Sequence, residues 1–251
     1  MDKKNRIRLD KLLVERMIVP TRQRAQALIM AGHVLIGENV TDKTGALVYS
    51  DAEIRIKGND NLYVSRGGLK LKGALESFNI IVKDLVALDV GASTGGFTDC
   101  LLKEGAAKVY ALDVGYGQLA WKLRKDNRVI CIERTNIRYF DGAGITDKID
   151  IAVIDASFIS LKLVIPSVLK LIDEEALVIA LIKPQFEVGR KEVGKRGIVS
   201  DPVLHMKVID EIADFCRGIN LDVLGICDSP LMGQAGNKEF FIYLRKTKES
   251  M

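Results

Sequence analysis

From Leu85 onward the chain alternates short apolar runs with stretches of helical character, and this alternation limits the possible folds more than any other feature. Seven runs are expected to be strands: 85–90, 108–114, 128–133, 149–155, 176–183, 221–227 and 239–246. The first five are mostly continuous Val, Ile, Leu and Ala, which is typical of strands buried on both faces of a parallel sheet. Helices are expected at 66–78, 95–104, 116–125, 161–172 and 201–217. The pattern predicts a doubly wound α/β sheet.

A glycine-rich turn follows the first of these strands. The run ends in LDVGASTGGFTD, and the second run ends in Asp113, whose carboxylate can accept hydrogen bonds from ribose hydroxyls. The glycine spacing is G-x-x-x-G-G and no Walker Lys-Ser/Thr follows, so S-adenosylmethionine is a better candidate cofactor than NAD or ATP. Such a turn alone also serves simple chain reversal. The candidate cofactor-binding residues are Asp89, Gly91, Ala92, Ser93, Thr94, Gly95, Gly96, Phe97 and Asp113.

Four charged residues are expected at the carboxyl edge of the same sheet, where ligands of such folds bind. Asp155 closes the fourth strand, Lys183 closes the fifth, and Glu239 begins the last, which reaches this edge if it runs antiparallel. Lys70 lies on the helix before the first strand. Each residue alone would be read as a surface charge, but together they suit chemistry on a hydroxyl group. An amine can accept the hydroxyl proton or, as ammonium, stabilise the alkoxide, and Lys183 is best placed for this.

The first 58 residues have a different pattern. Ile7, Leu9, Leu12, Leu13 and Met17 predict one helix with a buried face. A second helix is expected from a Thr21 cap to Gly32, with its apolar stripe at Ala25, Leu28 and Ile29, and three short β-like pieces follow.

This N-terminal region also holds all the excess positive charge of the chain. Residues 1–58 have 11 Lys or Arg against 7 Asp or Glu, whereas the remainder is neutral. Such a surface suits a polyanion, although a solvated helix face would have the same charge. The segments RLDKLLVER, TRQRAQALIMAGHVLIGENV and AEIRIKG resemble the S4-type RNA-binding domain. Candidate RNA-binding residues are Arg6, Arg8, Lys11, Arg22, Arg24 and, beyond this region, Arg66.

Nearly the whole chain resembles the TlyA-type (haemolysin A) family, which joins an S4 domain to an FtsJ/RrmJ-like methyltransferase. The motifs SRGGLKL, GASTGGFTD, IDASFISL, LIKPQFE and GNKEF carry the resemblance. It implies 2′-O-methylation of ribosomal RNA, with cytidines of the 16S or 23S rRNA as targets and ribosomal RNA or subunits as partners. It also implies a catalytic tetrad, which falls on Lys70, Asp155, Lys183 and Glu239, with Lys72 only two residues from Lys70.

The fold implied by the resemblance is a Rossmann-like class I methyltransferase sheet of seven strands, the last antiparallel, behind a small α+β S4-like domain. We expect the S4-like domain at 1–58, a linker at 59–64 and the methyltransferase domain at 65–251. The longest uncharged apolar run, 176–182, is far below the ~20 residues of a membrane span. Four scattered cysteines and two histidines predict neither disulfides nor a zinc site. A cytoplasmic protein without metal or membrane partner is expected.

Three other functions remain open at this point. Base methylation is disfavoured because DASF stands where amino-methylating enzymes commonly have N/D-P-P-Y/F. A membrane-active haemolysin would need spanning segments that the sequence does not offer. An RNA-binding assembly factor would have no chemical need for the four charged residues. Residues 184–200 between the fifth strand and the last helix are either a lid that orders on RNA or an ordinary surface loop.

Overall fold

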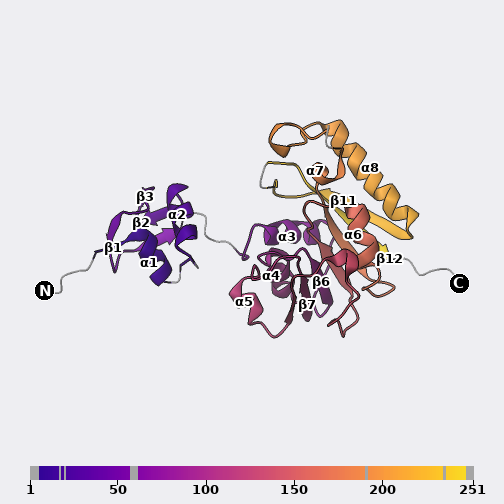
Figure 1. The fold of residues 1–251 in the computed structure, drawn as a ribbon, viewed down its shortest axis with the longest axis horizontal. Coiled ribbons are helices and arrows are strands. Elements are labelled where there is room, and N and C mark those ends of the chain that lie inside the picture. Colours follow the sequence, from indigo (N-terminus) through magenta and orange to yellow (C-terminus); the bar gives the residue numbers. More distant parts are fainter. Residues whose placement is uncertain are drawn as a thin grey trace. The chain divides into compact units, whose positions relative to one another are not determined.

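The computed structural model describes residues 6–16, 18–19, 21–56, 62–189, 192–233 and 236–246. The chain divides into two compact units, residues 1–61 and 62–251 (Figure 1). Met17 and the first half of the expected linker, residues 59–61, lie outside the described residues. Tyr63 is buried within the second unit.

The second unit is built on a seven-stranded sheet in the order β11-β12-β10-β9-β6-β7-β8. Strands β6 to β10 run parallel, and β12 is antiparallel to both of its neighbours, which confirms the predicted sheet. Its strands are β6 (Val86–Val90), β7 (Lys108–Leu112), β8 (Val129–Ile132), β9 (Ile151–Ile154), β10 (Leu177–Ile182), β11 (Leu221–Asp228) and β12 (Phe240–Lys246).

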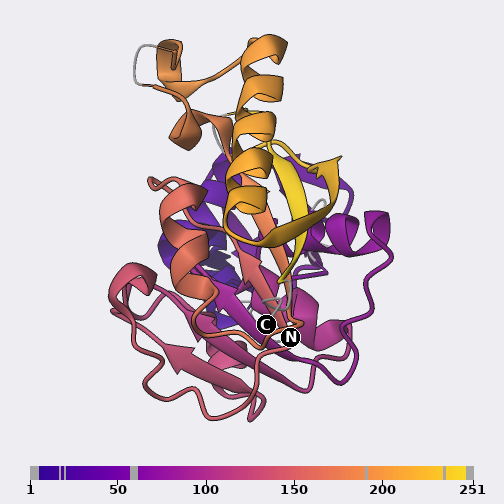
Figure 2. The same cartoon turned by 90° about the vertical axis from the view of Figure 1, so that its right-hand side faces the viewer.

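Helices cover both faces of this sheet (Figures 1 and 2). They are α3 (Gly67–Ser77), α4 (Gly96–Lys103), α5 (Trp121–Arg124), α6 (Leu161–Val168), α7 (Pro184–Glu187) and α8 (Pro202–Gly218). Apolar side chains of α3, α4 and α5 form one core with one face of the sheet, and those of α6 and α8 form a second core with the other. The two cores explain why the central strands are apolar at nearly every position, with Asp89 of β6 the exception.

The first unit folds around its own small core. It contains β1 (Arg6–Arg8), α1 (Leu9–Glu15), α2 (Arg22–Met30), β2 (Val34–Ile36), β3 (Asn39–Thr41), β4 (Leu47–Tyr49) and β5 (Ile54–Ile56). β1 pairs with β4, and β3-β2-β5 form a second small sheet. The Thr21 side chain accepts a hydrogen bond from the Arg24 backbone N–H, as expected of an N-cap.

Three helix predictions need correction. Ile7 belongs to strand β1, where it pairs with Val48, and the first helix begins only at Leu9. The helix expected at 116–125 is reduced to α5, because Gly117 has a left-handed φ of +71° that a right-handed helix does not include. The backbone N–H groups of Gly115 and Gly117 donate to the carboxylates of Asp113 and Glu133. The helix expected at 161–172 ends at 168 and tightens into a turn.

Candidate active site at the carboxyl edge of the sheet

Lys183 directly follows β10 and has only 10% of its side chain exposed. Its Nζ lies 2.6 Å from Oδ1 of Asp155, which directly follows the neighbouring parallel strand β9. The same ammonium donates a hydrogen bond to Ser157 Oγ at 2.7 Å. An ammonium has three N–H donors, so these two contacts leave one donor for a further acceptor.

A second lysine–carboxylate pair joins α3 to the start of β12. Lys70 Nζ lies 2.5 Å from Oε2 of Glu239, a side chain that is only 3% exposed. Because β12 runs antiparallel, its first residue lies at the same edge as the last residue of β10. Lys72 points elsewhere and pairs with Glu104 at 2.9 Å and Glu76 at 3.4 Å. The structure therefore places Lys70, and not Lys72, at the site.

The register of the sheet brings the two pairs together. Ile182 of β10 faces Phe240 of β12. The next facing positions are those of Lys183 and Glu239, just beyond the paired residues. All four charged residues expected at this edge thus meet there, as two ion pairs with little access to water.

The glycine-rich turn between β6 and α4 lies beside these pairs. Gly91 has φ +87°, and a Cβ there would lie 2.6 Å from the backbone oxygen of Asp155. Glycine is therefore needed for the turn to pass so close to the end of β9. Among the expected cofactor-binding residues, Ser93 and Thr94 are exposed and Gly91 is half-buried, whereas Ala92, Gly95, Gly96 and Phe97 are buried beneath the turn.

Asp89 is fully buried under this turn. Thr98 donates a hydrogen bond to its Oδ2 at 2.6 Å, while Oδ1 has no hydrogen-bond partner among the described residues. Burial raises the pKa of Asp89 to about 7, and the charges of Asp155 and Asp113 act in the same direction. Three carboxylates, those of Asp89, Asp113 and Asp155, thus lie around the turn close enough to affect one another's charge.

Asp113 stands at the end of β7 on the rim of the turn. Its Oδ2 accepts the Ser93 backbone N–H at 2.7 Å, and its Oδ1 accepts that of Gly115 at 2.6 Å. Each carboxylate oxygen retains a lone pair that can accept a ribose hydroxyl. A nucleoside with a positively charged group suits these residues, because they offer acceptors at the rim and negative charge below it. The set therefore fits S-adenosylmethionine.

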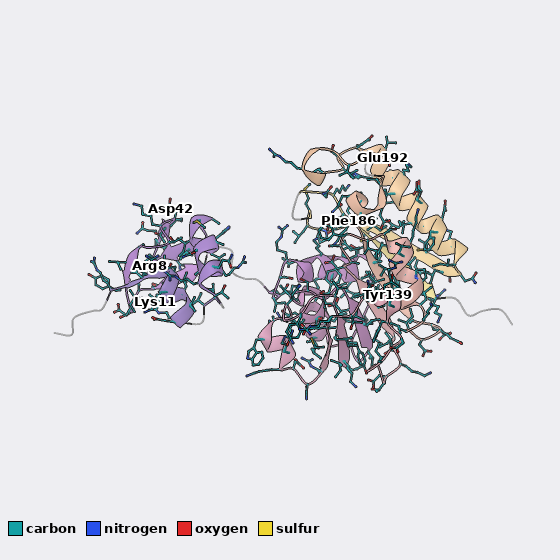
Figure 3. All side chains as sticks on the ribbon, in the orientation of Figure 1. Arg8, Lys11, Asp42, Tyr139, Phe186 and Glu192 are labelled. Atoms are coloured by element: carbon teal, nitrogen blue, oxygen red, sulfur yellow. The ribbon has the colours of Figure 1, made fainter. Side chains whose placement is uncertain are left out.

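Two aromatic residues near Lys183 were not identified from the sequence. Phe158 is 90% exposed and has a left-handed φ of +64°, which is strained for a side chain of this size. Its ring centroid lies 4.9 Å from that of Phe186 on α7, and Lys183 Nζ lies 6.0 Å from the Phe186 centroid. Figure 3 labels Phe186. The signal that could have found this surface is an exposed aromatic residue with a strained backbone, which sequence pattern alone does not reveal.

The described part of segment 184–200 is anchored near its end. The buried Asn237 side chain accepts the Val199 backbone N–H at 2.9 Å and donates to the Gly197 carbonyl at 2.9 Å. A ring nitrogen of His205 lies 2.8 Å from the Val199 carbonyl oxygen. Residues 197–199 are therefore fixed to the chain just before Glu239, which restricts any lid motion to the residues before them.

The basic surface of the first unit is organised by one buried acid, Asp10. Its carboxylate binds Arg8 through two hydrogen bonds of 3.0 Å, Arg22 at 2.9 Å and Gln26 at 3.0 Å. The Arg8 hydrogen bonds, with those of Gln26 and Arg22, hold the pKa of Asp10 well below its usual range despite its burial. Both arginines remain about half exposed, so each still presents N–H donors to solvent.

The other residues expected to bind RNA are exposed. Arg6 contacts Tyr49 through a hydrogen bond of 3.2 Å and a cation–π contact, and Lys11 forms an ion pair of 3.4 Å with Glu15 (Figure 3). Arg24 lies on the exposed first turn of α2. In the second unit, Arg66 donates to the carbonyl of Met232 at 3.0 Å.

Two absences concern the described residues only. Within them no helix has the length and apolar character to cross a membrane. Across the same ranges, no three His, Cys, Asp or Glu side chains are grouped so that they would hold a metal ion.

Comparison with known proteins identifies both units. The family model of FtsJ-like methyltransferases matches residues 63–246, and that of the S4 domain matches residues 7–54. The chain is 49% identical over 238 residues to the candidate rRNA methyltransferase YqxC of Bacillus subtilis, covering 94% of this chain and 85% of YqxC. It is 44% identical over 248 residues to the 16S/23S rRNA (cytidine-2′-O)-methyltransferase TlyA of Mycobacterium tuberculosis, covering 96% and 90%.

A solved structure agrees with this result. The candidate hemolysin from Streptococcus thermophilus superposes with a TM-score of 0.77 at 43% identity, covering 98% of this chain and 90% of that one. The resemblance noted in the sequence is confirmed, and so is the methyltransferase class of the enzyme. The chain belongs to the TlyA-type family, in which an S4 domain precedes an FtsJ-like methyltransferase domain.

Proposed function

We propose that the enzyme transfers a methyl group from S-adenosylmethionine to a ribose 2′-hydroxyl of ribosomal RNA. The observation that carries the proposal is the meeting of two lysine–carboxylate pairs beside a glycine-rich turn at the carboxyl edge of the sheet. A base-methylating enzyme has no need of two such pairs. Cytidines of the 16S and 23S rRNA are the proposed targets, because a relative of 44% identity is named for that reaction. The cytoplasm, where ribosomes are made, is the corresponding location.

Ser93, Thr94, Gly91 and Asp113 would hold the cofactor at the rim of the turn, above the carboxylate of Asp89. S-adenosylmethionine, when bound, supplies a methyl group that its sulfonium charge already makes electrophilic. The protein then has to align the ribose oxygen with that group and manage one proton.

Lys183 is assigned to the reacting oxygen. Once Lys183 has released a proton to solvent, its amine accepts the hydroxyl proton while the methyl group passes from the sulfonium sulfur to the ribose oxygen, and the ammonium formed again lies 2.6 Å from the Asp155 carboxylate that compensates its charge. Ser157 holds the same nitrogen from a second side. Lys70, neutralised by Glu239, is assigned to orient the hydroxyl or the adjoining phosphate. No metal is needed for these steps.

RNA is proposed to reach this edge with help from both units. Arg8 and Arg22, held by Asp10, give the S4 unit a fixed pair of guanidinium groups for a phosphate backbone. In the methyltransferase unit, Phe158 offers an exposed face on which an unpaired base can stack.

The test is methyl transfer from labelled S-adenosylmethionine to unmodified 30S and 50S subunits and to naked rRNA, followed by nucleoside mass spectrometry. Lys183→Ala and Lys70→Ala are compared with Lys72→Ala, a lysine on the same helix that pairs with Glu104 away from the site. We expect a 2′-O-methylated nucleotide in wild type and Lys72→Ala, and a loss of at least 100-fold in the two site variants. A methylated base would overturn the ribose assignment, and equal rates in all variants would overturn the site.

A further inference from the structure

The loop after β9 and the short helix α7 carry most of the groups that surround the reacting position. The loop holds Asp155, Ser157 and Phe158, and the α7 turn holds Lys183 and Phe186. The two segments touch through the ion pair and hydroxyl contact of Lys183 and through the rings of Phe158 and Phe186, which are tilted at 47° to one another. Their relative position therefore decides where the exposed face of Phe158 lies with respect to the Lys183 amine.

A third contact joins the far ends of these segments. Glu187, the last residue of α7, accepts the Ser160 hydroxyl on Oε2 at 2.6 Å and the Leu161 backbone N–H on Oε1 at 2.8 Å. Ser160 is the N-cap of α6, and its Oγ also accepts the Lys162 N–H at 3.1 Å. Glu187 thus closes the β9–α6 loop onto α7 through both of its carboxylate oxygens.

The loop needs such a restraint. Phe158 lies between Asp155 and Ser160 and has a left-handed backbone conformation that a bulky residue avoids unless its surroundings enforce it. Asp155 holds one end of the loop through Lys183. Glu187 holds the other end, because its carboxylate accepts hydrogen bonds from the Ser160 hydroxyl and from the Leu161 backbone N–H. Without it the loop is free to relax to an ordinary φ, which would carry Phe158 and Ser157 away from Lys183.

We propose that Glu187 is a positioning residue, whose contacts with Ser160 and Leu161 hold Phe158 and Ser157 in register with Lys183. The proposal rests on the proposed function, since the register matters for placing a nucleotide against the amine. Glu187 itself touches no reacting group. Its effect on the rate comes through the loop, where a misplacement of about 1 Å costs on the order of 100-fold.

The experiment compares Glu187→Ala, Glu187→Gln and a matched control, Glu211→Ala. Glu211 on α8 pairs with Lys162 at 3.0 Å, so its removal takes a carboxylate from the same neighbourhood while leaving both Glu187 contacts intact. Gln can still accept the Leu161 N–H and can donate its amide hydrogen to Ser160 Oγ. Each full-length variant is measured for amide hydrogen exchange over residues 155–163 without RNA and for kcat and KM on its RNA acceptor.

We expect Glu187→Ala to accelerate exchange at Leu161 and in the preceding loop at least tenfold and to lower kcat about 10- to 100-fold. Glu187→Gln should stay within about fivefold of wild type, and Glu211→Ala should be unchanged. A wild-type kcat in Glu187→Ala would overturn the proposal, as would equal losses in Glu187→Ala and Glu211→Ala. The exchange measurement needs no substrate. If wild type methylates a base instead of a ribose, the proposed function fails while kcat on that base still tests Glu187.

Discussion

Gly233 lies against the Glu239 carboxylate so closely that a Cβ on it would collide with Oε1 of that side chain. Oε2 of the same carboxylate holds Lys70. The backbone at Gly233 therefore packs directly against the ion pair of the site. Gly233, which was not identified from the sequence, limits the positions that the Glu239 carboxylate can take.

Gly233→Ala should displace the Glu239 carboxylate and weaken its contact with Lys70. We expect kcat to fall about 10- to 100-fold. The melting temperature should fall as well, because the carboxylate that must move is buried and ion-paired. Gly218→Ala is the matched control, since no atom lies within 4 Å of the added methyl group there. Unchanged turnover in Gly233→Ala would show that the Glu239 position is not required.

Asp89→Asn should change how stability depends on pH. The Asp89 pKa is about 7 in the folded state, above that of an unfolded aspartate near 4. The wild type therefore carries no penalty below about pH 4, loses stability from there to pH 7 by up to about 1.4 kcal/mol per pH unit, and carries the full penalty above pH 7. Asn has the same shape and no charge to bury, so the variant should gain on wild type over this window.

The measurement is urea unfolding of both proteins between pH 5 and 8. The difference in unfolding free energy should widen as pH rises and level off above pH 7. A difference that is the same at every pH would contradict the raised pKa. The gain should accompany a loss of methyl transfer, because the variant removes negative charge from beneath the turn.

Phe158→Ala should weaken RNA binding without unfolding the protein. The side chain is 90% exposed, so little packing is lost. Stacking on one base is worth about 1–3 kcal/mol, which corresponds to a KM increase of roughly 5- to 150-fold. Phe158→Tyr should retain the wild-type KM. Ile81→Ala is the control, an 81% exposed apolar residue that precedes β6 and so lies toward the other edge of the sheet. A KM increase of equal size in Ile81→Ala would contradict the stacking role.

Asp10→Asn should destabilise the S4 unit and impair its grip on RNA. Asn keeps one acceptor but loses the charge shared by Arg8 and Arg22, and because both arginines are about half exposed we expect a cost of about 1–2 kcal/mol. Thermal unfolding of the full chain should show one early transition while the methyltransferase unit keeps its own. Filter binding against salt should show a reduced slope, because fewer phosphate contacts form. An unchanged dependence of RNA binding on salt would show that Asp10 does not position the arginines for RNA.

The sequence predicts those features of the molecule that depend on the pattern of neighbouring residues. Continuous apolar runs predicted β6 to β10, and the strand ends placed Asp155 and Lys183 because parallel strands share one carboxyl edge. Lys70 was a weaker case, since its contact with Glu239 depends on side-chain reach between residues 169 positions apart. The choice between Lys70 and Lys72 needed the three-dimensional position of Glu104.

Other features had no local signal. Glu187 and Ser160 are ordinary polar residues whose meaning comes from a contact between two loops. Helix α7 is only four residues long, too short for any periodicity to show. At 116–120 the left-handed Gly117 interrupts the helix that the sequence predicts, and a glycine's sign of φ has no signal in the apolar pattern.

Strand β12 is inserted between β10 and β11, and it is also the last strand in the chain. A ribosome makes α3 with Lys70 before any strand of the large sheet, and it makes β12 with Glu239 after all the others. During synthesis Lys70 therefore has no Glu239 carboxylate to pair with until β12 has been made and has paired with β10 and β11. Ribose methylation then requires the complete sheet, because a chain stopped before residue 239 would lack both Glu239 and the strand that joins β11 to β10.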